Sequence, residues 1–151
     1  MEELLSVKDL YEKMYDLDSL VRCQVARKID QEGLHKMVND KNFIIREIIV
    51  KRINQAGLHK MINDEVSHIR YEVAKRINQK GLYKMMNDLD IGVRWEVVSR
   101  INQAGLHKMI NDPSFLIEIE VAKRIDHAGL HKMRNDYNPY VRKVVEERLN
   151  K

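Results

Sequence analysis

The sequence lacks several features that would point to common protein classes. Its 151 residues include one cysteine, Cys23, so no disulfide can form within the chain, and this fits a reducing compartment. No apolar run approaches the roughly 18 residues of a membrane helix. The first residues, MEELLSVKDL, show no basic segment followed by an apolar one, so we expect no signal peptide. We therefore predict a cytoplasmic protein that does not enter a membrane.

Motifs that carry catalysis are also missing. The sequence has no glycine-rich phosphate loop, no His-Glu-x-x-His pair and no nucleophile elbow. The six histidines and Cys23 never adopt the spacing of a zinc finger. Cys23 falls at a variable position of a predicted helix, where a surface or packing role is more typical than a nucleophilic one. We predict a non-enzymatic protein without a cofactor or a metal.

What the sequence does contain is a repeat of 24 residues. The segment INQAGLHKMIND occurs at 53–64 and again at 101–112, and glycines recur at 33, 57, 81, 105 and 129. A fixed period of this size is typical of stacked helical arrays. We predict a single solenoid domain over 1–151, with an N-terminal capping unit at 1–20, five repeats at 21–140 and a C-terminal capping helix at 141–151.

Each repeat predicts one long helix and one short helix. In the repeat at 40–63, Ile45, Ile49, Val50 and Ile53 fall on one face of a helix. We expect Gly57 to end that helix in the left-handed conformation, which glycine adopts most easily. The apolar residues that follow predict a short α-helix or 3₁₀ helix, and the pattern does not distinguish them.

Polar residues mark the start of the long helices. The expected N-caps are Asn42, Asp90, Ser114 and Asn138, with Ser67 as the cap that replaces Val66 in the second repeat. The segment IEIEVA at 117–122 alternates like a strand, but its sister segments do not, so we predict a helix there too. Because one helix pair cannot bury its own apolar face, the pairs must stack into an all-α solenoid.

The repeats resemble a known family. The pattern Asp-x₄-[Val/Ile]-Arg recurs, for example from Asp40 to Arg46 and from Asp88 to Arg94. It resembles the HEAT-repeat motif, in which Asp and Arg form a ladder between units. With the 24-residue period, the chain looks most similar to the leucine-rich variant repeat. This resemblance implies a right-handed α-solenoid of alternating α- and 3₁₀-helices. An iron–sulfur cluster known in that family needs several cysteines, and Cys23 stands alone.

Two columns of residues admit a metal site or a structural role. The methionine column could offer soft ligands, but its place beside the leucines favours core packing. The histidine column would place equivalent side chains about 10 Å apart, which is too far for shared coordination. The columns comprise Met37, Met61, Met85, Met109, Met133 and His35, His59, His107, His131.

Two basic columns suggest an alternative function in nucleic-acid binding. A ladder of cations could follow a phosphate backbone. The other interpretation is that the lysines are solvated, while Arg52 and its copies cap short-helix carbonyls or pair with Asp. The possible phosphate contacts are Lys36, Lys60, Lys84, Lys108 and Lys132, and the second column is Lys28, Arg52, Arg76, Arg100, Arg124 and Arg148.

The variable face of the long helices suggests a protein-binding surface. The helical phase predicts that Tyr71, Trp95 and Ile119 lie side by side on adjacent helices, with Leu116 close by and Tyr140 in reach. Exposed Trp and Tyr in an apolar strip are typical of an interface. If the phase is wrong, these residues pack against a neighbouring layer instead.

One position breaks the Asp–Arg pattern. Glu118 stands where an arginine should follow Asp112 and pair with it, beside the predicted strip, and it is either functional or drift. The leading prediction is a scaffold that binds a protein partner through these residues, and a homodimer through the same strip is compatible with it. A HEAT-like DNA glycosylase would need an acidic residue and aromatics in a basic cleft, which the sequence does not assemble.

Overall fold

The computed structural model describes residues 6–150, and every regular element in that range is an α-helix. The chain divides into two compact units, Met1–Ile77 and Asn78–Lys151, and each is described by itself. Unit 1 contains α1 Val7–Lys13, α2 Ser19–Lys28, α3 Gln31–Met37, α4 Phe43–Arg52, α5 Gln55–Lys60 and α6 Ser67–Arg76. Unit 2 contains α7 Gln79–Met85, α8 Ile91–Arg100, α9 Gln103–Leu106, α10 Phe115–Arg124, α11 His127–Met133 and α12 Pro139–Leu149.

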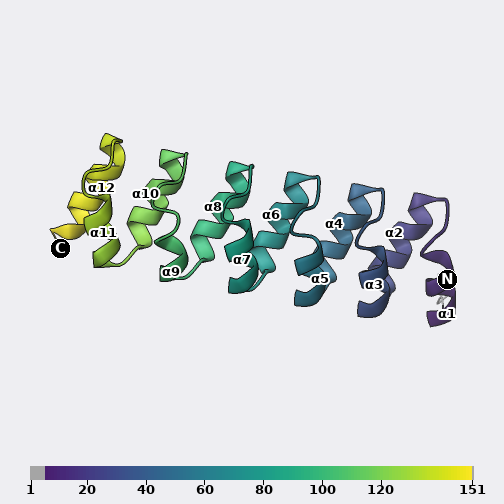
Figure 1. Cartoon of the computed structure of the whole chain (residues 1–151). Helices are drawn as coiled ribbons and strands as arrows, with labels where there is room; N and C mark the ends of the chain where they lie inside the picture. Colours follow the sequence, from purple (N-terminus) through teal and green to yellow (C-terminus); the bar gives the residue numbers. More distant parts are fainter. Residues whose placement is uncertain (1–5, 151) are drawn as a thin grey trace. The chain divides into compact units, whose positions relative to one another are not determined.

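Within each unit, long and short helices alternate along the chain and like helices lie side by side (Figure 1). The long helices α2, α4 and α6 pack in succession in unit 1, and α8, α10 and α12 do so in unit 2. The predicted α-solenoid is therefore confirmed as the arrangement of the repeats. The short helices are α-helical in the described part of the chain, which settles the choice between α and 3₁₀.

The long helices form where the apolar pattern predicted them. Ile45, Ile49 and Val50 of α4 are fully buried, as is the next apolar residue, Ile53. The segment 117–122 is helical, within α10, as predicted. Asn42 caps α4 by accepting a hydrogen bond from the backbone N–H of Ile44. Apolar burial and a polar cap together explain the start and the inward face of each long helix.

One predicted cap, Ser67, was wrong, and a second, Ser114, is at the predicted position without the capping hydrogen bond. Ser114 occupies the N-cap position of α10, but its side chain makes no capping hydrogen bond. Val66 is the N-cap residue of α6, again without a side-chain bond, and Ser67 is already the first helical residue. In both repeats the aspartate two residues before the cap accepts from the cap residue's own N–H: Asp64 from Val66, and Asp112 from Ser114. This turn positions the backbone at the start of the helix even where no side chain caps it.

The glycine prediction was wrong as well. No described residue has a positive φ, so Gly57 does not end a helix in the left-handed conformation. The long helix ends at Arg52, Ile53 is extended at φ −68° and ψ 149°, and Asn54 caps the short helix by accepting from the N–H of Gly57 at 3.1 Å. A Cβ on Gly57 would lie 2.1 Å from Cγ1 and Cδ1 of Ile53. Glycine is needed there for space and not for backbone freedom.

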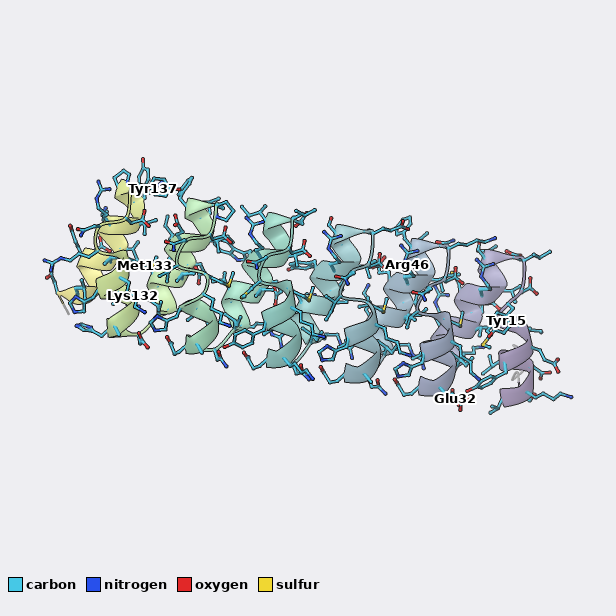
Figure 2. All side chains as sticks on the ribbon, in the orientation of Figure 1. Tyr15, Glu32, Arg46, Lys132, Met133 and Tyr137 are labelled. Atoms are coloured by element: carbon cyan, nitrogen blue, oxygen red, sulfur yellow. The ribbon has the colours of Figure 1, made fainter. Side chains whose placement is uncertain are left out.

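The methionine column lies in the core, as predicted. The exposed fraction of each of these side chains is 3% or less. Figure 2 labels Met133 and its neighbour Lys132 on α11, and the two have different surroundings, because Met133 is buried while Lys132 is exposed. Methionine fills the irregular space between helices because its side chain is flexible and polarisable.

The ends of the repeats differ from the predicted boundaries. The last helix runs from Pro139 to Leu149, not over 141–151, and Pro139 takes the first helical position. At the start, α2 begins at Ser19, inside the segment assigned to the capping unit at 1–20, and residues 1–5 of that segment lie outside the described range. Within that range, no helix combines the length and the apolar character that crossing a membrane requires.

Candidate protein-binding interface

An Asp–Arg ladder holds neighbouring repeats together within each unit, as the resemblance implied. In unit 1, Nε of Arg22 donates to Oδ2 of Asp40 at 2.8 Å, and Arg46 bonds Asp64 in the same way at 2.7 Å. In unit 2, Nε of Arg94 lies 2.9 Å from Oδ2 of Asp112. Each arginine thus pairs with the aspartate of the following repeat, in the bidentate geometry that guanidinium and carboxylate prefer.

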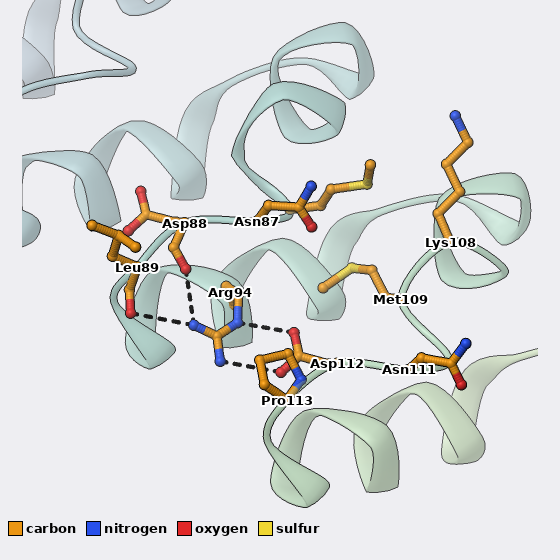
Figure 3. Close-up of a pocket in the computed structure, with 10 residues that line it drawn as sticks. Asn87, Asp88, Leu89, Arg94, Lys108, Met109, Asn111, Asp112 and Pro113 are labelled. Carbon is orange, nitrogen blue, oxygen red and sulfur yellow. Dashed lines mark hydrogen bonds and ion pairs between the residues drawn. The ribbon is translucent and has the colours of Figure 1, made fainter.

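Each arginine of the ladder also binds the repeat from which it comes. Nη1 of Arg94 donates to the backbone carbonyl oxygens of Asp88 and Leu89, at 2.8 and 3.3 Å (Figure 3). A hollow of about 460 Å³ opens beside this rung, lined in part by Lys108 and Pro113. A complete rung therefore satisfies two carbonyl oxygens and one carboxylate with a single guanidinium group.

The arginine–aspartate pairs of the ladder are buried, and they stabilise the fold. Burial by itself would raise the pKa of the Asp40 carboxyl, but hydrogen bonds from Arg22 and from the N–H of Asn42 outweigh it, and the pKa lies below its ordinary value. Removing one partner of such a pair leaves an uncompensated buried charge, which is strongly destabilising. The ladder therefore stabilises the packing of adjacent repeats within each unit.

The arginines of the second basic column have a structural role, but they cap a different helix from the one predicted from the sequence. Arg52 donates to the carbonyl oxygens of Ala26 and Ile29, at the C-terminal end of the long helix α2. Arg148 does the same for Ala122 and Ile125, at 2.8 and 2.7 Å. These arginines cap long-helix carbonyls, not short-helix carbonyls or Asp side chains. Cations are favourable at helix C-termini, where carbonyls lack partners.

A glutamine column was missed by the sequence interpretation. The amide of Gln31 donates to the carbonyl oxygen of Arg52 at 3.0 Å and accepts from the N–H of Asn54 at 2.9 Å. In unit 2, Gln79 makes the same two bonds to Arg100 and Asn102. Each side chain bridges the break between the next long and short helices. Glutamine follows the Asn or Asp cap in four repeats, at 31, 55, 79 and 103, and this recurrence was the signal that could have revealed it.

The histidine column also bonds the following repeat. Nε2 of His35 lies 3.0 Å from Oδ1 of Asn54, and Nε2 of His107 lies 3.0 Å from Oδ1 of Asp126. Tyr83, which replaces histidine in its repeat, donates to Oδ1 of Asn102 at 2.7 Å. The partners are the N-cap residues of the next short helices. Among residues 6–150, no group of three or more acidic, His or Cys side chains is placed to hold a metal ion.

The lysine column is exposed, but parts of it have local partners. Lys36 pairs with Glu32 at 2.8 Å and lies over the ring of Tyr11 at 4.8 Å from the centroid. Lys108 lies 5.1 Å from the ring centroid of Tyr83. The predicted phosphate contacts Lys36, Lys60, Lys84, Lys108 and Lys132 all lie on or beside the short helices. In the second basic column, by contrast, the arginines bind backbone carbonyl oxygens and do not form a row of free cations for a phosphate backbone. These arginines are Arg52, Arg76, Arg124 and Arg148.

Unit 2 exposes apolar side chains on the outer face of its long helices. Trp95 of α8 is 40% exposed, Leu116 of α10 is 45% exposed, and Ile119 is half-buried. Because α8 and α10 pack side by side, Trp95 and Ile119 occupy equivalent positions on neighbouring helices (Figure 1). We name this surface the apolar strip, and its members are Ile91, Trp95, Phe115, Leu116, Ile119 and Tyr140.

Two of its members extend the predicted set. Ile91 and Phe115 were missed, and both stand at the first position of their long helices, 24 residues apart, which is the signal that could have found them. The ring of Phe115 stacks on the ring of Tyr140 at a centroid distance of 6.4 Å. The strip therefore presents both aliphatic and aromatic groups, the composition found at protein interfaces.

Tyr71 belongs to unit 1 and has different surroundings. It is half-buried, its ring stacks on His68 at 6.5 Å, and Lys75 lies over it at 5.6 Å. In the same unit, Cys23 is half-buried and unoxidised. The equivalent position of the repeat between them is Glu47, which pairs with Lys51 at 2.7 Å. In unit 1 the residues of this column are therefore half-buried, whereas Trp95 of unit 2 is exposed.

Glu118 does not belong to the exposed surface on which we placed it. Its exposed fraction is 2%, and its Oε2 atom has no hydrogen-bond partner. The predicted pairing was also wrong, because Asp112 is already bound by Arg94, and an arginine at 118 would reach Asp136 instead. Burial raises the pKa of the Glu118 carboxyl to about 7, and the charges of Asp136 and Asp112 act in the same direction.

Comparison with known proteins identifies the repeat type. No family model matches the sequence, and no curated protein matches it either. A solved structure described as a leucine-rich repeat variant with a novel repetitive motif is similar, with a TM-score of 0.82 and 29% identity over 96% of this chain. The chain is built of helical repeats of the leucine-rich variant type. It spans 62% of the length of that protein.

A more distant structure shares the fold alone. YibA of Escherichia coli matches with a TM-score of 0.51 and 18% identity, over 93% of this chain and 68% of its own. Neither similarity points to a ligand or a reaction.

Proposed function

We propose that the chain is a non-enzymatic scaffold that binds a protein partner through the apolar strip of unit 2. One observation carries the proposal: two packed helices hold Trp95 and Leu116 at 40% and 45% exposure, outside the buried core of the same unit. Interface hot spots are enriched in Trp and Tyr. The partner would present aliphatic or aromatic side chains to the strip.

The repeat positions support a binding role for Trp95. Its counterpart one repeat later is Ile119, and the next is Lys143, so the stack accepts an aromatic, an aliphatic or a charged side chain there. Stability therefore does not require tryptophan at this position. By contrast, the buried position two residues earlier is Val93, Ile117 and Val141, which is apolar in each repeat of the unit.

The test is capture of partners from a lysate of the native host, with and without nuclease treatment. Wild-type protein should retain a protein partner after nuclease, and Trp95→Ala should weaken its affinity by about 2 kcal/mol or more. Leu17→Ala removes an exposed apolar side chain in unit 1, outside the strip, and should leave capture unchanged.

Two further measurements complete this experiment. Trp95 should emit as an exposed tryptophan that iodide quenches, and Trp95→Ala should cost little stability. Sedimentation of the purified protein tests whether a second copy occupies the strip. Capture that is lost with nuclease, or that is equal for wild type and Trp95→Ala, would refute the proposal.

A further inference from the structure

Besides the apolar strip, the fold leaves one more feature unexplained: the Asp–Arg ladder is interrupted at Glu118, which stands in place of an arginine. In the complete rung before it, Arg94 binds the carbonyl oxygens of Asp88 and Leu89 and the carboxylate of Asp112. The corresponding acceptors one repeat later are the carbonyl oxygens of Asp112 and Pro113 and the carboxylate of Asp136. Within residues 6–150, no side-chain donor bonds those two carbonyls, and no lysine or arginine pairs with Asp136.

The side chain that replaces the arginine adds a further acceptor to this place. Glu118 is 2% exposed, and its Oε2 atom has no hydrogen-bond partner. It lines a hollow of about 380 Å³ together with Pro113, Asp136 and Tyr137. A buried carboxylate oxygen without a donor is costly, and a water, an ion or a ligand group could supply the missing donor.

We propose that this hollow binds a guanidinium group, supplied by an arginine side chain of a protein partner. The group would sit between Glu118 and Asp136 and complete the missing rung from outside the chain. Arg46 shows that the ladder accepts this arrangement, because its guanidinium binds two carboxylates, those of Asp64 at 2.7 Å and Glu65 at 3.0 Å.

A guanidinium group fits better than a metal ion or an ammonium group. Both carboxylate oxygens of Asp112 are engaged by Arg94, and among residues 6–150 no group of three or more acidic, His or Cys side chains is placed to hold a metal ion. The acceptors lie on both sides of the hollow, at Glu118 and at Asp136, so a planar group with five donors can reach more of them than a point charge can. Lys132 also lines the hollow, but no ion pair to either carboxylate forms.

The charges that face Glu118 agree with this assignment. Asp112 lies on the loop before α10, Asp136 and Tyr137 on the loop before α12, and Lys132 on α11. Tyr137 lines the same hollow as Glu118, and the charge of Glu118 raises the pKa of the Tyr137 hydroxyl. Figure 2 shows Tyr137 at the start of the last long helix, α12. A bound cation would relieve the repulsion between the carboxylates.

The test titrates the whole protein with N-acetyl-arginine methylamide and follows its backbone amides by NMR. The matched ligand control is N-acetyl-citrulline methylamide, which keeps the shape and lacks the charge. We expect saturable shifts at residues 118 and 136–137 with the arginine compound alone. Glu118→Gln should weaken binding by about tenfold or more, because a charge-assisted hydrogen bond is lost.

Three variants separate this site from alternatives. Glu118→Arg should fill the rung, raise the melting temperature and abolish binding. Glu120→Gln removes a carboxylate from the same helix outside the hollow and should leave binding unchanged. Trp95→Ala should also leave it unchanged, so failure of the apolar strip and failure of this site are distinguishable. Shifts that are equal with citrulline, or that survive Glu118→Gln, would overturn the proposal, as would the absence of a saturable shift.

Discussion

Replacing Glu118 by glutamine should flatten the dependence of stability on pH. Folding raises the pKa of this carboxyl from an ordinary value of 4.5 to about 7, since burial and then Asp136 and Asp112 disfavour its charge. The folded protein thus holds the proton more tightly than the unfolded chain does. The contribution of Glu118 to stability is fully present below pH 4.5 and is lost as the pH rises through about 7.

The expected magnitude follows from the size of that shift. One pKa unit corresponds to about 1.4 kcal/mol, so a rise from 4.5 to about 7 costs on the order of 3 kcal/mol once the carboxyl is fully charged. Glutamine has nearly the same shape and no charge in this range. Wild type and Glu118→Gln should therefore have similar stability near pH 4.5, and the variant should be more stable above about pH 7.

Urea unfolding followed by circular dichroism measures this difference. Both proteins are unfolded at intervals from pH 4.5 to about 8, and a nearest-neighbour model is fitted because stacked repeats need not unfold together. Other carboxyls titrate in both proteins and cancel in the comparison. Glu120→Gln serves as the control, since it lies on the same helix but outside the hollow. Parallel curves for wild type and Glu118→Gln would refute the assignment of a buried, destabilised carboxyl.

The remaining predictions concern the repeat contacts and the basic columns. Gly57→Ala should lower the unfolding free energy by about 1–3 kcal/mol in urea titrations, because the new Cβ would lie 2.1 Å from Ile53, whereas the exposed Ala56→Ser should change it little. Arg94→Met should cost about 3–5 kcal/mol in the same assay, because its aspartate partner stays buried without a counter-charge, and an equal loss in a surface control would contradict the ladder. We expect no tight, salt-sensitive complex with DNA or RNA in filter binding, and such a complex would favour the nucleic-acid alternative if it needed Lys60, Lys84 and Lys108.

The fold could be predicted from the sequence because the period constrains it several times over. Buried positions such as Ile45, Ile49 and Val50 recur in each repeat, and a helical phase derived from one repeat can be checked on the others. The glycine could not be assigned correctly in this way. An invariant glycine is consistent with a left-handed backbone or with a close contact, and only the structure shows that Gly57 faces Ile53 at the break between helices.

The contacts between repeats were harder to predict than the core. Periodicity reports which face of a helix is buried, but it does not report which residue of the next repeat a polar side chain reaches. For that reason Gln31 was missed, Arg52 was placed on the wrong carbonyls, and Glu118 was paired with the wrong aspartate. The recurrence of Gln31 and Arg52 and the exception at Glu118 were visible in the sequence, while their partners required coordinates.

Near-identical repeats also supply internal controls that an ordinary globular domain lacks. The rung of Arg94 shows which acceptors a side chain meets at that position, so the replacement at Glu118 leaves two carbonyls without a side-chain donor and the carboxylate of Asp136 without a cationic partner, although it accepts from the N–H of Asn138. Likewise, Ile119 and Lys143 show that stacking does not demand tryptophan at the position of Trp95. Both departures lie on α8 and α10, two helices that pack against each other. The core of unit 2 accounts for neither of them, and a partner that combines an apolar side chain with an arginine would account for both.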